Sequence, residues 1–166
     1  MVWLLRSALT MLVLASVSMP VASQQVQVVI NGDYPALQHN AEAYIGGIKG
    51  RSALGLRRFA PTAVKQASEA LRALGYYSPE IRWLLEPNKG DTKKPLQLIL
   101  TIVPGEPVRI KTRTVTIEGA GKYDAKFTSY LPTKPALGDV LNHGEYSTLR
   151  ETLTTRARQR GYFDGK

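Results

Sequence analysis

The stretch "LRALGYYS", residues 71–78, ends a helical pattern with a glycine and two aromatic residues. It nearly recurs as "RQRGYFD", residues 158–164, where Gly161 lies 86 residues after Gly75. A glycine at this place ends a helix in the left-handed conformation, and the aromatic residues after it start the return of the chain toward a sheet. The recurrence indicates an internal repeat of one unit in which a helix packs on a sheet.

The first copy of the unit reads as strand, helix, helix, strand, strand. Polar and β-branched residues alternate over 25–30, and apolar residues recur at helical spacing over 35–48 and 61–74. Alternating apolar residues return over 81–86 and 96–103. The last stretch is largely apolar on both faces and is expected at the centre of the sheet, whereas the one before it is flanked by prolines and is expected at an edge. The sequence therefore predicts an α+β unit with a three-stranded mixed sheet and helices on one face.

The second copy begins like the first but stops early. Residues 114–119 repeat the opening strand with the same Ile-x-Gly ending, 87 residues on. A short helix capped by Asp124 and a longer helix capped by Asn142 follow. The apolar face of the longer helix is formed by Tyr146, Leu149, Leu153 and Ala157. The chain ends at Lys166, and a single strand cannot pair its backbone groups, so we expect it to be the front part of a longer protein.

The first 23 residues have the layout of a secretory signal peptide. Arg6 is their only charge, an apolar run follows over 8–17, and small residues precede a cleavage point after Ser23. The apolar run is shorter than the roughly 20 residues of a membrane-spanning helix, and Pro20 ends it. The mature chain is therefore expected to begin at Gln24 and to be exported.

The composition is that of a folded, exported protein without disulfides. The sequence has no cysteine and a hydrophobic fraction of 43%, so hydrophobic packing must stabilise it. The formal net charge is +9, which raises nucleic acid as a partner. The basic residues are dispersed and do not interleave with aromatic ones, and an exported protein seldom meets nucleic acid, so we expect no such partner. Attraction to an anionic membrane surface or to acidic clients fits the charge better.

No group of residues has the pattern of a catalytic or metal site. His39 and His143 are far apart, and no cysteine accompanies them. His143 and Ser147 are within reach of each other on a helix but lack the third group that a nucleophile needs. A Gly-Ala-Gly at 119–121 is a weak phosphate-loop signal, because Asp124 stands at the place of the third glycine. The sequence therefore predicts no enzyme, no cofactor and no metal.

The edge of the predicted sheet is the remaining candidate site. Backbone donors and acceptors on an edge strand can pair with an extended segment of another protein. Each added hydrogen bond contributes about 1 kcal/mol net, so about four or five bonds give weak binding that tolerates many client sequences. The alternative, that this edge is solvated or covered by the rest of the protein, stays open. The candidate residues for partner binding are Ile81, Arg82, Trp83, Leu84 and Leu85.

Three stretches resemble a known family. They are "LGYYSPEI" at 74–81, "TIVPGEPV" at 101–108 and, longest and most specific, "LGDVLNHGEYSTLRETLTTRARQRGYFD" at 137–164. With the strand-helix-helix-strand-strand order after a signal peptide, they resemble the polypeptide-transport-associated (POTRA) domains of the outer-membrane protein assembly superfamily. Within it, they resemble the TamA-like translocation and assembly module proteins. The resemblance covers nearly all of the mature chain.

The resemblance implies tandem POTRA domains in the periplasm of a Gram-negative bacterium. Residues 24–107 would form the first domain and 108–166 a second one that lacks its last two strands. A third POTRA domain and a C-terminal β-barrel, which would hold the protein in the outer membrane, would follow beyond this sequence. The family has no catalytic residues or cofactors to carry over.

The resemblance also implies a function in protein assembly. TamA-like proteins help to insert outer-membrane proteins, notably autotransporters, so unfolded outer-membrane proteins would be the clients and a TamB-like protein anchored in the inner membrane would be the partner. The alternative is a structural envelope protein with POTRA-like scaffold domains, although the repeated unit argues against a protein with a single such unit. A further alternative is an exported enzyme whose catalytic residues lie beyond Lys166, and nothing in the sequence supports it.

Overall fold

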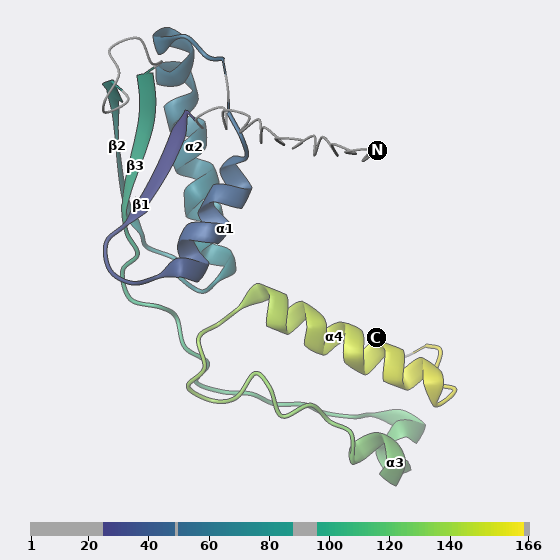
Figure 1. The fold of residues 1–166 in the computed structure, drawn as a ribbon. Coiled ribbons are helices and arrows are strands. Elements are labelled where there is room, and N and C mark those ends of the chain that lie inside the picture. Colours follow the sequence, from purple (N-terminus) through teal and green to yellow (C-terminus); the bar gives the residue numbers. More distant parts are fainter. Residues whose placement is uncertain (1–24, 49, 88–95, 165–166) are drawn as a thin grey trace, which may run out of the picture.

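The computed structural model describes residues 25–48, 50–87 and 96–164 (Figure 1). Within these ranges, a three-stranded sheet with two helices comes first and a helical part that contains no sheet follows it. The predicted signal peptide, 1–23, lies outside the described residues. None of the helices in the described ranges combines the length and the hydropathy that a membrane span requires.

The first part has the predicted order of elements. Strand β1 (Val26–Ile30) is followed by helices α1 (Pro35–Ile45) and α2 (Ala53–Ala73) and by strands β2 (Glu80–Pro87) and β3 (Leu96–Val103). The sheet order is β1-β3-β2, with β1 parallel and β2 antiparallel to β3. The mixed sheet and the central place of β3 are therefore confirmed, and β2 is an edge strand, as its flanking prolines indicated.

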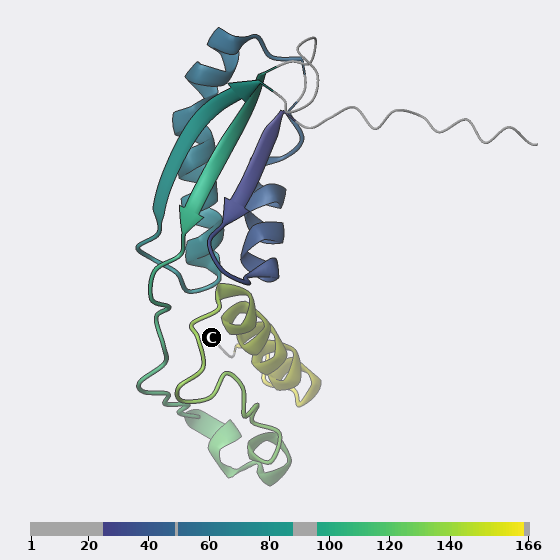
Figure 2. The same cartoon turned by 60° about the vertical axis from the view of Figure 1, so that its left-hand side comes forward.

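Both helices cover the same face of the sheet and leave the other face open (Figures 1 and 2). The core lies between the sheet and the helices, because alternate residues of β1 and β3 are buried there. The strands contribute Val26, Val28, Ile30, Leu98, Leu100 and Ile102 to this core. The helices contribute Leu37, Ala41, Ile45, Leu56, Ala60, Ala63, Ala67, Ala70 and Leu71. Small alanine side chains on α2 let its backbone come close to its neighbours.

Helix α2 begins earlier than the sequence pattern suggested. Pro61 was expected at its first turn, but the helix starts at Ala53, where the Ser52 side chain accepts a hydrogen bond from the Gly55 amide at 3.2 Å. Pro61 therefore lies inside the helix. Its side chain is exposed, so the carbonyl that loses its intrahelical partner can be hydrated on the solvent side. The interior proline is compatible with the helix for this reason.

The second part contains two short helical turns and one long helix. They are η1 (Gly119–Tyr123), α3 (Ala125–Thr128) and α4 (His143–Gln159). The predicted caps are confirmed: Asp124 accepts hydrogen bonds from the amides of Lys126 and Phe127, and Asn142 accepts from the first turn of α4. These side chains satisfy amide groups that a helix start leaves unpaired.

The strand predicted over 114–119 is not formed. In the described residues after 107, only an isolated bridge between Arg109 and Val140 has sheet-like pairing. A strand needs a neighbour to pair its backbone groups, and no second strand is present among the described residues of this part. The prediction was therefore wrong for this segment, although its sequence has the alternation of a strand.

The two glycine-aromatic motifs have the same local geometry, which supports the internal repeat. Gly75 has φ of 91° and Gly161 has φ of 86°. The amide of Tyr76 donates to the carbonyl of Leu71 at 3.0 Å, and the amide of Tyr162 donates to the carbonyl of Ala157 at 2.9 Å. This is the hydrogen bond that closes a helix end around a left-handed glycine.

Candidate functional site

The candidate residues 81–85 alternate between the two faces of the sheet along β2. Ile81, Trp83 and Leu85 pair with buried residues of β3 and share their helix-facing side. Ile81 and Leu85 pack against the core, whereas Trp83 remains 43% exposed. Arg82 and Leu84 lie on the open face, and Leu84 is 41% exposed. The candidate residues thus present apolar and charged side chains beside an edge of the sheet.

Strand β2 is the longer of the two edge strands. It has eight residues, and one of its two sides has no strand beside it in the described part of the chain. β1, which the sequence analysis did not consider as a binding edge, has five residues. The buried Gln25 ties its start to the loop after α1, because its side chain bonds the backbone of Arg51 at 3.0 and 2.8 Å. β2 is therefore the better candidate for pairing with another chain.

The open face of the sheet carries both apolar and polar side chains. Val29 of β1 and Val103 of β3 are exposed on this face, and Ile99 and Thr101 of β3 are half-buried on it. Ile99 pairs with Leu84 across β3 and β2. An extended segment that paired with β2 would therefore bring its open-face side chains next to Leu84 and Arg82.

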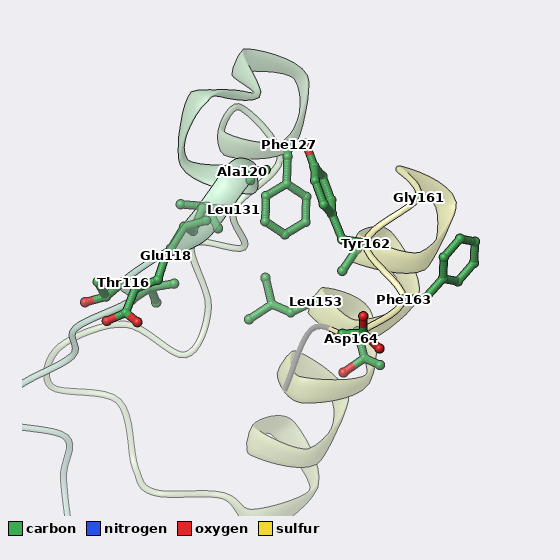
Figure 3. A pocket seen from close by; sticks show the side chains of 15 residues that line it. Thr116, Glu118, Ala120, Phe127, Leu131, Leu153, Gly161, Tyr162, Phe163 and Asp164 are labelled. Atoms are coloured by element: carbon green, nitrogen blue, oxygen red, sulfur yellow. The ribbon is translucent and has the colours of Figure 1, made fainter.

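The second part encloses a hollow of about 780 Å³ between the segment 115–118 and helix α4 (Figure 3). Leu153 projects from α4 into the hollow, toward Phe127 and Leu131. The predicted apolar face of α4 is partly covered: Ala157 is buried, Leu149 and Leu153 are half-buried, and Tyr146 is 53% exposed. In the first part, the corresponding helix α2 is covered by the sheet.

The carboxylate of Asp124 ties the short helical turns to the end of α4. It accepts hydrogen bonds from Arg160 Nε at 2.9 Å and Tyr162 Oη at 3.2 Å, in addition to its role as a cap. The bond from Arg160, together with the Phe127 amide, holds the pKa of Asp124 below its ordinary value of 3.8. The ring of Tyr162 also lies 5.9 Å from the ring of Phe127.

We expect acid to loosen this second part. A carboxyl group whose pKa is lowered by folding contributes stability that is fully present above the unfolded pKa and is lost as the pH falls through the folded pKa. For Asp124 that loss occurs below pH 3.8. The loosening of the second part is measured by the near-ultraviolet circular dichroism of its tyrosines during acid titration. Asp124→Asn should reduce the acid-induced change, and an identical change in both proteins would contradict the prediction.

The other polar groups that the sequence analysis considered do not form a catalytic site. His39 is exposed on α1, and Ser147 is exposed on α4. The segment 119–121 lies in η1 and does not form a phosphate loop. Within the described residues, no cluster of histidine, cysteine and acidic side chains could hold a metal ion.

One contact of His143 was missed by the sequence analysis. The sequence pattern paired His143 only with Ser147, but its Nε2 lies 2.5 Å from Tyr77 Oη of the first part. The two residues are 66 positions apart, and no pattern in the sequence pairs them. The repeated glycine-aromatic motif marked Tyr77, but gave no sign of its partner.

A comparison with protein families provides an independent view of the first part. Residues 27–104 match the family described as POTRA domain TamA domain 1. The matched range contains β1, α1, α2, β2 and β3 and lies within the first domain expected from the sequence.

Proposed function

We propose that the TamA-type POTRA domain that residues 27–104 form acts in the periplasm as a non-catalytic binding module in outer-membrane protein assembly. The observation that carries this proposal is the edge strand β2, with Trp83 and Leu84 exposed beside it. Such an edge can accept an extended segment of another chain as an additional strand. POTRA domains are a non-catalytic family, which supports a role in binding.

The energetics favour transient binding of unfolded segments. About four or five backbone hydrogen bonds, each contributing about 1 kcal/mol net, give only a few kcal/mol against an association cost of similar size. Burial of the exposed parts of Trp83 and Leu84 adds a hydrophobic contribution. Backbone pairing requires no particular client sequence, so this edge is suited to a module that passes extended chains along.

The proposed clients are unfolded outer-membrane proteins such as autotransporters, and the proposed partner is a TamB-like protein anchored in the inner membrane. The matched TamA family supports both. The second candidate function is a structural scaffold in the envelope, in which β2 contacts no client. The two functions differ in whether β2 touches client protein while it is being transported.

Site-specific photo-crosslinking tests the proposal. A photo-reactive phenylalanine at Trp83 is expected to crosslink to client protein, because the side chain lies beside the strand-accepting edge. The matched control is Tyr44, which is 46% exposed on α1, close to the 43% of Trp83. Crosslinks at position 83 and few at position 44 are expected. Equal yields at the two positions would favour the scaffold function.

We also propose that residues 108–166 form most of a second POTRA domain. Three observations support this: the matching helix ends at Gly75 and Gly161, the apolar face of α4 that is only partly covered, and the hollow beside it. Two further strands, placed as β2 and β3 are in the first domain, would fill the hollow. Reading the coding sequence that follows Lys166 tests the proposal, because two alternating apolar stretches at the same spacing as β2 and β3 are expected there.

A further inference from the structure

The two equivalent glycines have different surroundings. A Cβ atom at Gly75 would lie 2.6 Å from the carbonyl oxygen of Leu141 and 2.7 Å from Val140 Cγ1. At Gly161, no atom of the described residues other than its immediate chain neighbours lies within 4 Å of the same added Cβ. Both glycines end a helix with positive φ and the same hydrogen bonds. Because Gly75 has no Cβ, a segment of the second part can contact this helix end. Gly161 has no such contact to accommodate in the described part of the chain.

Backbone hydrogen bonds hold the two parts together around Gly75. The carbonyl of Gly75 accepts from the amide of Val108 at 2.9 Å, and the carbonyl of Val108 accepts from the amide of Leu141 at 2.8 Å. The next residues, Arg109 and Val140, form an isolated bridge. The chain leaving the first domain is thus paired with the segment that enters α4, and this pair lies against the end of α2.

Side chains extend this contact to the first residue of α4. Tyr77 Oη and His143 Nε2 are 2.5 Å apart, and their ring centres are 6.0 Å apart. The guanidinium group of Arg72, in the last turn of α2, lies over the Tyr77 ring at 5.5 Å. Because His143 begins α4, the bond fixes the start of that helix next to the end of the first domain (Figures 1 and 2).

We propose that the helix end at residues 75–77 is an inter-domain joint that sets the direction of α4 relative to the first domain. Gly75 provides the close approach, and Tyr77 and His143 act as positioning residues. Backbone pairing restricts the connecting chain, and the tyrosine-histidine bond restricts rotation of α4 about that connecting chain. The two parts then move as one body, and the β2 edge and the hollow beside α4 keep a fixed separation. This proposal does not depend on the nature of the client.

The distance between two spin labels tests the joint in the whole protein. The sequence has no cysteine, so cysteines introduced at Lys65 on α2 and Arg150 on α4, both exposed, are the only sites to be labelled. One narrow distance distribution is expected. Gly75→Ala should shift or broaden it, because the new Cβ collides with the backbone of Leu141. Gly161→Ala introduces the same strain at a helix end without a collision and should leave the distribution unchanged.

Two milder variants decide the matter if Gly75→Ala does not fold. Tyr77→Phe removes the hydroxyl group and keeps the ring under Arg72, so it is expected to broaden the distance distribution. Tyr146→Phe removes a hydroxyl from a side chain of α4 that is 53% exposed, and no change is expected. A broad or multiple distribution in the unaltered protein would overturn the proposal. An unchanged distribution in Tyr77→Phe would overturn the positioning role of the tyrosine-histidine bond.

Discussion

Replacing Leu100 by alanine is expected to lower the free energy of unfolding of the first domain by about 2–5 kcal/mol. Leu100 lies in the middle of the central strand and is completely buried. Its neighbours across the sheet are Val28 of β1 and Trp83 of β2. The strands on both sides and the helices above restrict the collapse of the cavity. The loss of unfolding free energy should therefore be well above that of a substitution at the surface.

The matched control is Leu84→Ala, on the open face of the same sheet. It removes the same atoms from a side chain that is 41% exposed, so a loss of about 1 kcal/mol is expected. Urea unfolding, followed by tryptophan fluorescence, measures both variants, because Trp83 lies in the sheet and the other tryptophan, Trp3, lies in the predicted signal peptide. Equal losses of unfolding free energy in the two variants would mean that the core does not lie on the helix-covered side of the sheet.

The first domain could be predicted from the sequence because its signals are local. β3 is largely apolar on both faces, which is the pattern of a central strand, and β2 is bounded by prolines, which is the pattern of an edge. The edge position of the candidate residues followed from these two patterns. Their exposure did not, because it depends on how far the helices reach across the sheet. Trp83 shares a face with the core and is still 43% exposed.

The inner face of α2 was only partly predicted. The spacing over 61–74 predicts a stripe of Val64, Ala67, Leu71 and Leu74. Ala67 and Leu71 are completely buried, whereas Val64 and Leu74 are half-buried, and the stripe left out Ala60 and Ala63, which are also completely buried. Alanine has no hydrophobic signal strong enough to mark a face, and its burial here follows from the close approach of α2 to its neighbours. The early start of α2 was missed for a different reason, since an exposed interior proline looks like a helix start.

The second part shows what sequence patterns leave undetermined. The alternation over 114–119 is typical of a strand, but a strand also needs a partner, and the described residues contain none beside it. The contact between Tyr77 and His143 depends on the path of the chain between the two parts. The helix caps at Asp124 and Asn142 were predicted correctly because each involves only the next few residues.

Proline at one of two neighbouring positions of β2 is expected to reduce client crosslinking at least about tenfold, which corresponds to about 1.4 kcal/mol, without unfolding the domain. Successive residues of a strand direct their amides to opposite sides. Of Trp83 and Leu84, one therefore donates toward β3 and the other toward the free edge. Proline at the residue whose amide donates toward β3 removes a hydrogen bond of the sheet and should destabilise the domain by about 1 kcal/mol or more. Proline at the residue whose amide points toward the free edge leaves the sheet intact and places its ring where the client strand would pair.

Circular dichroism and urea unfolding identify which of Trp83→Pro and Leu84→Pro keeps the fold. A photo-reactive residue at Arg82, exposed on the same strand, then reports client contact in that variant. Trp83→Val is the control for the side chain, because valine retains the amide and the strand propensity while removing the indole ring. Loss of crosslinking in the folded proline variant, with most of it retained in Trp83→Val, would establish backbone pairing as the binding mode. Crosslinking at the unaltered level in a folded proline variant would show that clients do not pair with β2.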